Sequence, residues 1–200
     1  MERYLASFGL IVLAFFWISE TPGKKPVIIN NFDSPTGFEE FTYSGPDPGA
    51  VKAKTDLCQT GEYDNCAYQG ENARWIEWNL GDHEWYGWGM HLRGFDTKGM
   101  KFLTFSVRGE LGNERFLIKM RDSDGNEVGF NSNHYNEITN QWTEMIVPLR
   151  DFQRANEEFN LNSLDNINLG FNTLSAGKKG KIYIDNFKLE PRLVYGTRNN

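Results

Sequence analysis

The chain lacks the short motifs that mark common enzymes, and it lacks an excess of basic residues. None of the patterns G-x-S-x-G, H-E-x-x-H, G-x-x-x-x-G-K-[ST] and G-x-G-x-x-G occurs in its 200 residues. The sequence therefore offers no nucleophile elbow, zinc-protease helix or phosphate-binding loop. Lys and Arg number 21 against 27 Asp and Glu, whereas nucleic-acid-binding domains usually carry a basic patch. We expect a protein that is not an enzyme and that binds no nucleic acid.

Cysteine is scarce, with Cys58 and Cys66 as its only two representatives. Two cysteines without a nearby histidine cannot complete a zinc site, and their spacing is not the C-x-x-C of a redox motif. In an exported chain, an even number of cysteines at close spacing favours a disulfide that closes a small loop. A pair of free thiols is the alternative.

Long hydrophobic runs are also rare, and the one at residues 5–18 (LASFGLIVLAFFWI) stands alone. It is shorter than the roughly 20 residues that span a bilayer and fits the core of a signal peptide. Trp17 is bulky for a cleavage site, so an uncleaved membrane anchor is the alternative. We predict a helical signal peptide or anchor at residues 1–23, a folded domain at 24–190 and a tail at 191–200. The protein is then exported, to the periplasm, the cell surface or the medium.

The rest of the chain has the pattern of short β-strands. Apolar and polar residues alternate in several runs between Gly, Asn, Asp and Pro, as in strands with one buried face. The candidate strands are residues 74–80, 90–95, 102–109, 115–122, 143–149, 167–172 and 181–189. Residues 124–126 (DGN) form a hairpin-type turn, and only 149–158 suggest a helical turn. With no βαβ alternation, the pattern predicts an all-β antiparallel sandwich.

Aromatic rings cluster in one of these strand regions. Trp85, Tyr86 and Trp88 lie within four residues, next to Gly87 and Gly89. Flat rings stack against the C–H face of a sugar, and glycines allow the backbone to leave such rings exposed. We therefore expect these three rings in a ligand site; burial of one or two of them in the core is the alternative.

Polar side chains on the strands are the second candidate site. Alternation places His91 and Arg93 on one face, opposite Met90 and Leu92. The same reasoning points a larger set toward solvent: Arg108, Lys119, Arg121, Asn168 and Asn172. Cationic and amide groups of this kind suit sugar hydroxyls or an acidic sugar. An ordinary solvated face is the alternative.

The features between residues 32 and 189 together resemble the galactose-binding-like jelly-roll domains. The likeness is greatest to family 11 carbohydrate-binding modules and to the related complex I intermediate-associated-protein-like (CIA30-like) domains. It rests on residues 28–33 (IINNFD), 85–90 (WYGWGM), 103–109 (LTFSVRG), 116–122 (FLIKMRD), 146–149 (IVPL) with Trp142 and Phe152, and 182–187 (IYIDNF).

This resemblance implies a jelly roll whose concave sheet binds a glucan-like polysaccharide without catalysis. The CIA30-like domains imply an alternative, a membrane-anchored assembly protein that docks a protein partner at the membrane or cell surface. The resemblance also implies a structural Ca²⁺ that ties the first strand to the last, at Asn31, Asp33 and Asp185. Asp185 stands in an apolar run, where an unpaired carboxylate is costly. A hydrogen-bonded, metal-free Asp185 is the alternative.

Overall fold

The computed structural model of the chain describes residues 24–46, 52–60 and 66–193. The predicted signal or anchor segment at residues 1–23 lies outside these ranges, as does most of the predicted tail at 191–200. Within the described ranges, no helix is both long enough and apolar enough to cross a membrane.

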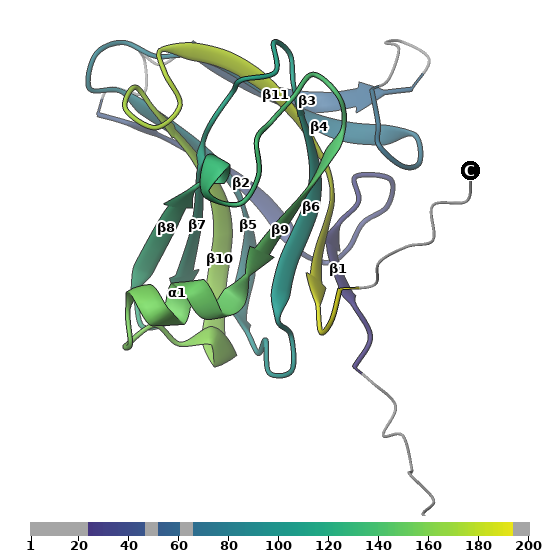
Figure 1. The fold of residues 1–200 in the computed structure, drawn as a ribbon, viewed down its shortest axis with the longest axis vertical. Helices are drawn as coiled ribbons and strands as arrows, with labels where there is room; N and C mark the ends of the chain where they lie inside the picture. The colour runs from purple at the N-terminus through teal and green to yellow at the C-terminus, as the bar shows by residue number, and fades with distance from the viewer. Residues whose placement is uncertain (1–23, 47–51, 61–65, 194–200) are drawn as a thin grey trace, which may run out of the picture.

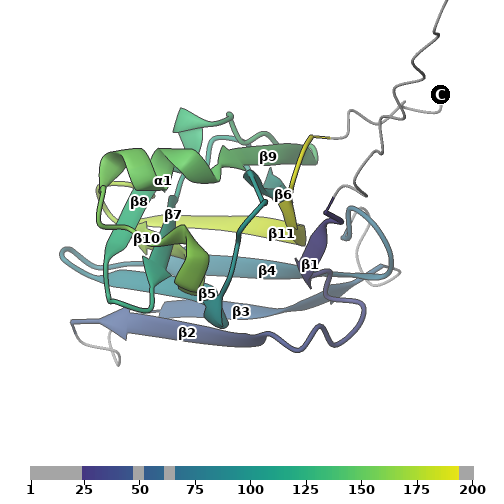
Figure 2. The ribbon, with the colours of Figure 1, turned by 90° about the horizontal axis from the view of Figure 1, so that it is seen from below.

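Two antiparallel sheets face each other and form a jelly-roll sandwich (Figures 1 and 2). Sheet A has the order β3 (Lys52–Gln59), β4 (Asn72–Asn79), β11 (Lys179–Glu190), β6 (Phe102–Gly109) and β9 (Thr143–Pro148), and β1 (Val27–Asn30) also pairs with β11. Sheet B has the order β2 (Glu39–Gly45), β5 (Trp85–Phe95), β10 (Leu164–Asn172), β7 (Leu117–Asp122) and β8 (Glu127–Asn131). The predicted antiparallel β-sandwich is confirmed.

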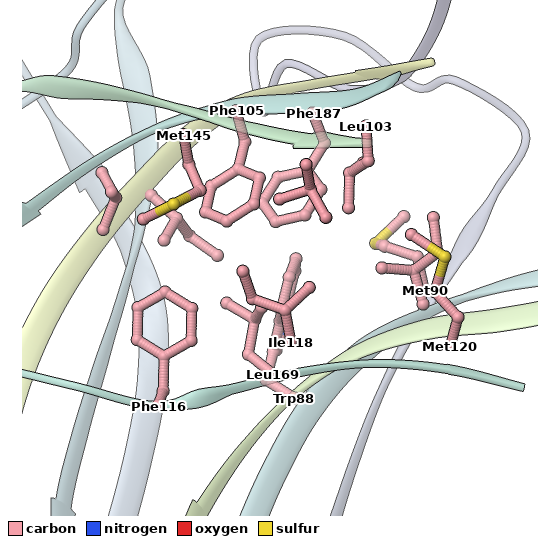
Figure 3. Close-up of a cluster of buried hydrophobic side chains, with 14 of the residues drawn as sticks. Trp88, Met90, Leu103, Phe105, Phe116, Ile118, Met120, Met145, Leu169 and Phe187 are labelled. Carbon is pink, nitrogen blue, oxygen red and sulfur yellow. The ribbon is translucent and has the colours of Figure 1, made fainter. Parts of the chain in front are cut away.

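The core lies between the sheets, where the inward-facing side chains of the two sheets meet (Figure 3). From sheet A, Phe105 of β6 stacks on Phe187 of β11, with ring centroids 4.4 Å apart. From the opposite layer, Ile118 and Trp88 of sheet B approach them, with Phe116 just before β7 (Figure 3). Each such buried side chain contributes about 1.5–3 kcal/mol, so the core holds the two sheets together.

A short helix closes one side of the sandwich. Helix α1 (Leu149–Ala155) follows β9 directly, and its Phe152 packs edge-on against Phe130 of β8 at 5.1 Å. The helix therefore bridges the last strands of the two sheets (Figures 1 and 2). Two 3₁₀ turns, η1 (Ser132–His134) and η2 (Leu161–Ser163), complete the connections. The predicted helical turn is confirmed at its N-terminal part.

Each of the seven predicted strands overlaps a strand of the structure, whereas β1, β2, β3 and β8 were not predicted. Three of these four lie at sheet edges: β3 in sheet A, and β2 and β8 in sheet B. An edge strand packs against fewer neighbours, so its inward positions need not be strongly apolar. β3 illustrates this, because Cys58 is its only buried residue.

The two cysteines form the predicted disulfide. Cys58 of β3 is bonded to Cys66, with Cα atoms 5.9 Å apart and both side chains buried. The bond fastens the end of β3 to the segment that leads into β4. That segment in turn contacts β11, since the backbone N–H groups of Tyr68 and Gln69 donate to Asp185 Oδ2.

Candidate functional site

The outer face of sheet B carries a row of four rings along β2 and β5. His91, Phe41, Tyr43 and Trp85 follow one another, with centroid distances of 4.3, 6.0 and 5.5 Å between successive rings. Strand pairing sets this order, because Glu39 lies opposite His91, and Gly45 opposite Trp85. The four rings therefore occupy successive outward positions over about 20 Å of strand. We call this set the ring row.

Glycines of β5 leave room for two rings of the row. Phe41 lies opposite Gly89, and Tyr43 opposite Gly87. A Cβ atom at Gly87 would come within 2.0 Å of Tyr43 Cζ, and one at Gly89 within 2.8 Å of Phe41 Cζ. The phenyl and phenol rings thus lie directly over the β5 backbone, in space that any side chain there would fill.

A line of polar groups on β10 and β7 runs beside the ring row. The Tyr43 hydroxyl donates to Asn168 Oδ1 at 2.5 Å, and Asn168 Nδ2 donates to Asn166 Oδ1 at 2.9 Å. On the next strand, Lys119 forms an ion pair with Glu127 of β8. Burial, assisted by the Glu127 charge, raises the pKa of Tyr43 well above its usual value. The phenol therefore stays protonated at neutral pH and keeps its role as a donor.

A hollow separates the ring row from the polar line at the Trp85 end. This cavity of about 280 Å³ lies over Gly170, which has no side chain to fill it. Its walls are aromatic on one side and polar on the other, with Tyr43 and Trp85 facing Lys119 and Asn172. Apolar surface with a few placed polar groups is the usual lining of a site for a small ligand or a sugar unit.

Six of the nine predicted ligand-binding residues lie on this outer face of sheet B. They are Trp85, His91, Arg93, Lys119, Arg121 and Asn172. Trp85 is 40% exposed, which leaves part of its indole open to a ligand. Arg93 lies at the opposite end of the ring row from Trp85, where it pairs with Glu39.

Tyr86 and Trp88 point the other way, into the sandwich, so their predicted stacking role needs correction. Trp88 is 1% exposed and Tyr86 is 7% exposed. In a strand, neighbouring side chains point to opposite faces, so these two rings face the core while Trp85 faces outward. Tyr86 also lines the hollow over Gly170. Trp88 instead donates from Nε1 to Glu40 Oε2 at 2.9 Å.

Arg108 also belongs elsewhere, because it lies on the outer face of sheet A. Its guanidinium stacks over the Tyr183 ring, 3.9 Å from the centroid, and lies 5.7 Å from the Trp142 ring. The prediction that Arg108 points away from the core is confirmed, but its strand β6 is in the opposite sheet from Lys119 and Arg121. Arg108 therefore cannot join their site.

The sequence reading missed Phe41 and Tyr43, which form the middle of the ring row. Their signal was the alternation in residues 39–45 (EEFTYSG), where two rings share one face with Glu39. Aromatic residues at such positions usually face a core, and here they face outward over glycines. The pairing of β2 with β5 was needed to place them.

Two of the predicted calcium residues, Asp33 and Asp185, lie around the start of β4 and the last strand. Asp33 Oδ1 accepts from the backbone N–H groups of Glu71 and Asn72, each at 2.9 Å. Asp185 is fully buried, and its Oδ1 atom has no hydrogen-bond partner, like Asn72 Oδ1. Asn31 Oδ1, the third predicted ligand, accepts from Ser34 Oγ at 3.4 Å.

The charge of Asp185 is poorly compensated by protein groups. Burial, with a smaller contribution from the nearby Asp33 carboxylate, raises its pKa to about 6 against the lowering effect of backbone N–H donors. In the part of the chain that the structure describes, no three His, Cys, Asp or Glu side chains form a metal-binding cluster. Any ion held here would need amide or backbone oxygens besides the two carboxylates, which Ca²⁺ accepts readily.

A jelly roll with an exposed row of rings on one sheet has the construction of a carbohydrate-binding module. Comparison with known proteins gives the family. The profile of the family described as carbohydrate binding domain 30 matches residues 30–191, and the chain belongs to this family. Comparison with curated proteins gives no match.

Solved structures of such modules share the fold. The family 30 module of the cellulosomal cellulase Cel9D-Cel44B of Clostridium thermocellum superposes with a TM-score of 0.64 at 20% identity, covering 88% of this chain and 99% of that chain. The family 11 module of cellulase Lic26A-Cel5E of the same organism gives 0.63 at 16% identity, covering 85% and 96%.

The expected likeness to family 11 is thus confirmed by structure, while the matching profile is that of family 30. Domains of these families bind carbohydrate and do not catalyse its conversion. The chain is a non-catalytic carbohydrate-binding module.

Proposed function

We propose that this module binds a β-glucan-like polysaccharide along the ring row on the outer face of sheet B. The observation that carries the proposal is the unbroken sequence of four rings beside a line of amide and charged groups. A family 11 module from Clostridium thermocellum was solved in complex with a β-1,3-1,4-mixed-linked tetrasaccharide, which supports a glucan as the ligand class.

The two halves of the face have different tasks. Phe41, Tyr43 and Trp85 contact the apolar C–H faces of successive sugar units, and these rigid rings lose little entropy on binding. The Lys119 ammonium and the Asn172 side chain lie to one side, on the polar wall of the hollow over Gly170. They supply the directional hydrogen bonds that select a sugar.

Affinity electrophoresis of the full chain through gels that contain soluble polysaccharides tests this function. We expect β-glucans to retard the protein and unrelated neutral polysaccharides to leave it unretarded. Retardation by no polysaccharide would overturn the proposal. It would favour the alternative, a jelly roll that docks a protein partner at the membrane or cell surface.

We further infer an exported location. The Cys58–Cys66 disulfide supports it, since such bonds persist in oxidising compartments and are rare in the cytosol. Treating intact cells with a membrane-impermeant protease tests a surface location, and fractionation distinguishes periplasmic from secreted protein. Recovery of the chain from the cytosol with both thiols reduced would contradict export.

We also propose a structural Ca²⁺ held by Asp33, Asp185 and Asn72, in place of the predicted Asn31. The unpartnered, buried Oδ1 atoms of Asp185 and Asn72 support it, because such acceptors need a cation or a donor. The ion would neutralise the Asp185 charge and tie β11 to the segments around Asp33 and Asn72.

Thermal unfolding of the full chain with Ca²⁺ and with chelator tests this site. We expect Ca²⁺ to raise the Tm, and Asp185→Asn to abolish that increase. Asp56→Asn is the matched control, since Asp56 is exposed and its carboxylate accepts from the N–H of Leu57 on β3, away from Asp185. No Tm difference between Ca²⁺ and chelator in the wild type would overturn the calcium site.

A further inference from the structure

A second cavity continues the binding face beyond the last ring of the row. It measures about 560 Å³ and lies between residues 82–84, which precede β5, and residues 172–174, which end β10 and begin the next turn. Trp85 and Asn172 line this cavity and also the smaller one over Gly170. The two hollows therefore adjoin at Trp85 and Asn172.

The walls of this outer cavity combine two apolar side chains that are unusually open to water. Trp85 is 40% exposed, and Leu174, on the turn after β10, is 97% exposed. Large hydrophobic side chains that project together into one hollow mark binding surfaces more often than scattered ones do. Together they offer an apolar contact to a flat ligand beside the indole.

The polar groups around this cavity are held in place by the loops themselves. Glu84 accepts the backbone N–H of Gly81, and Asp82 pairs with Lys178 at 2.8 Å. On the facing turn, Asn172 Oδ1 accepts from the backbone N–H groups of Leu174 and Ser175, at 3.0 and 2.8 Å. The carboxylates therefore sit beside the apolar walls as acceptors for hydroxyl donors.

We propose that this cavity is a terminal subsite, which binds one further neutral sugar unit of the chain that lies on the ring row. The subsite depends on the polysaccharide binding proposed above, because it takes the unit that passes beyond Trp85. Trp85 and Leu174 contact the C–H surface of that unit, and Glu84 accepts from one of its hydroxyls. Because Asp82 is already paired with Lys178, the Glu84 carboxylate is the charge that disfavours a uronic acid at this position.

The affinity of the full chain for β-glucan oligosaccharides of increasing length tests the subsite. We expect wild-type affinity to rise with length until the ring row and the terminal subsite are both filled. Leu174→Ala and Glu84→Gln should each remove the last increase, a loss of about five- to tenfold, and leave shorter oligosaccharides unaffected. Leu111→Ala is the matched control, since Leu111 is also an exposed leucine (77%) but lies after β6.

The outcomes separate the subsite from the function on which it depends. Wild-type protein that binds no oligosaccharide of any length would overturn the proposed function. The subsite alone would be overturned if Trp85→Ala weakens binding while Leu174→Ala and Glu84→Gln both keep the full dependence of affinity on oligosaccharide length. An equal loss for short and long oligosaccharides in these two variants would also overturn it.

The charge of the cavity gives a second readout. An oligosaccharide that ends in a uronic acid should bind more weakly than a neutral one of the same length, and added salt should narrow the difference. Glu84→Gln should also reduce this difference in affinity between the two oligosaccharides. Equal affinity for the two ligands at low salt would overturn the assignment of the subsite to neutral sugars.

Discussion

The Tyr43 hydroxyl reaches across β5 and donates to Asn168 Oδ1 at 2.5 Å, above the glycines at positions 87 and 89. This bond connects the ring row on β2 and β5 to the polar line on β10. Asn168 Nδ2 in turn donates to Asn166 Oδ1, and the Asn168 side chain is almost fully buried. The two halves of the binding face are thus joined before any ligand arrives.

Tyr43→Phe should separate the two contributions of this residue. The ring remains, so we expect most of the glucan affinity to persist, while Asn168 loses its donor and the protein loses about 1 kcal/mol of stability. Calorimetric titration and urea unfolding measure these effects. A loss of binding as large as that of Tyr43→Ala would show that the hydroxyl, rather than the ring, makes the dominant contact.

Gly87→Ala should weaken binding without touching a ligand directly. The new Cβ would lie 2.0 Å from Tyr43 Cζ, so the ring must swing off the β5 backbone. The displaced atoms belong to the end of a side chain, and we expect the fold to survive. Calorimetric titration should show an affinity close to that of Tyr43→Ala. Wild-type affinity in a folded Gly87→Ala protein would contradict the role of the Tyr43 ring in binding.

The alternation of residues 90–93 was enough to place His91 and Arg93 on one face, and the structure agrees. Extending the same alternation back to residue 85 would have separated Trp85 from Tyr86 and Trp88. The three rings were treated as one cluster because they are close in sequence, yet a strand sends neighbours to opposite faces.

Sequence could not reveal which strands are neighbours. Arg108 and Lys119 have the same solvent-facing alternation, but β6 and β7 belong to different sheets. The pairing of β2 with β5, which brings Phe41 and Tyr43 beside Trp85, depends on contacts across more than 40 residues of chain. The sandwich was predictable because its central strands alternate strongly, whereas its edge strands do not.

Glu40 connects the two layers, and its loss should destabilise the fold. It accepts from Trp88 Nε1 at 2.9 Å, from Arg74 Nη2 at 2.8 Å and from Asn30 Nδ2 at 3.1 Å. Glu40→Ala leaves these donors unpaired, and we expect a loss of about 2–3 kcal/mol in the free energy of unfolding. Urea unfolding measures it.

The neighbouring glutamate provides the control for Glu40. Glu39 pairs with Arg93 at the surface, where both side chains are more than half exposed. Glu39→Ala should therefore cost less than about 1 kcal/mol. Equal losses in the two variants would contradict a special role for Glu40 between the sheets.

Asp185 should make stability depend on pH. Burial raises its pKa from 3.8 to about 6, so the folded protein holds this proton more tightly than the unfolded chain. In the presence of chelator, its contribution to stability should fall as pH rises from about 4 to 6, and stay low above that range. Asp185→Asn should remove this contribution, as measured by urea unfolding between pH 4 and 7.

Calcium should reverse the cost of that charge, because the ion favours the ionised carboxylate. We therefore expect Ca²⁺ to stabilise the protein more at pH 7 than at pH 5. An equal effect of Ca²⁺ at both pH values would contradict binding through Asp185.

The most direct test of the ring row is calorimetric titration of the full chain with a β-glucan oligosaccharide, comparing Trp85→Ala with Trp75→Ala. Trp85 ends the ring row on sheet B, whereas Trp75 lies on β4 of sheet A, in contact with the Lys181 ammonium. Loss of the indole surface that a bound sugar would cover should weaken binding at least about tenfold for Trp85→Ala, since an apolar contact of this size is worth about 1.5–3 kcal/mol. Trp75→Ala should retain wild-type affinity. Retained affinity in Trp85→Ala, or loss of affinity in Trp75→Ala, would show that sheet B is not the binding sheet and would contradict the account.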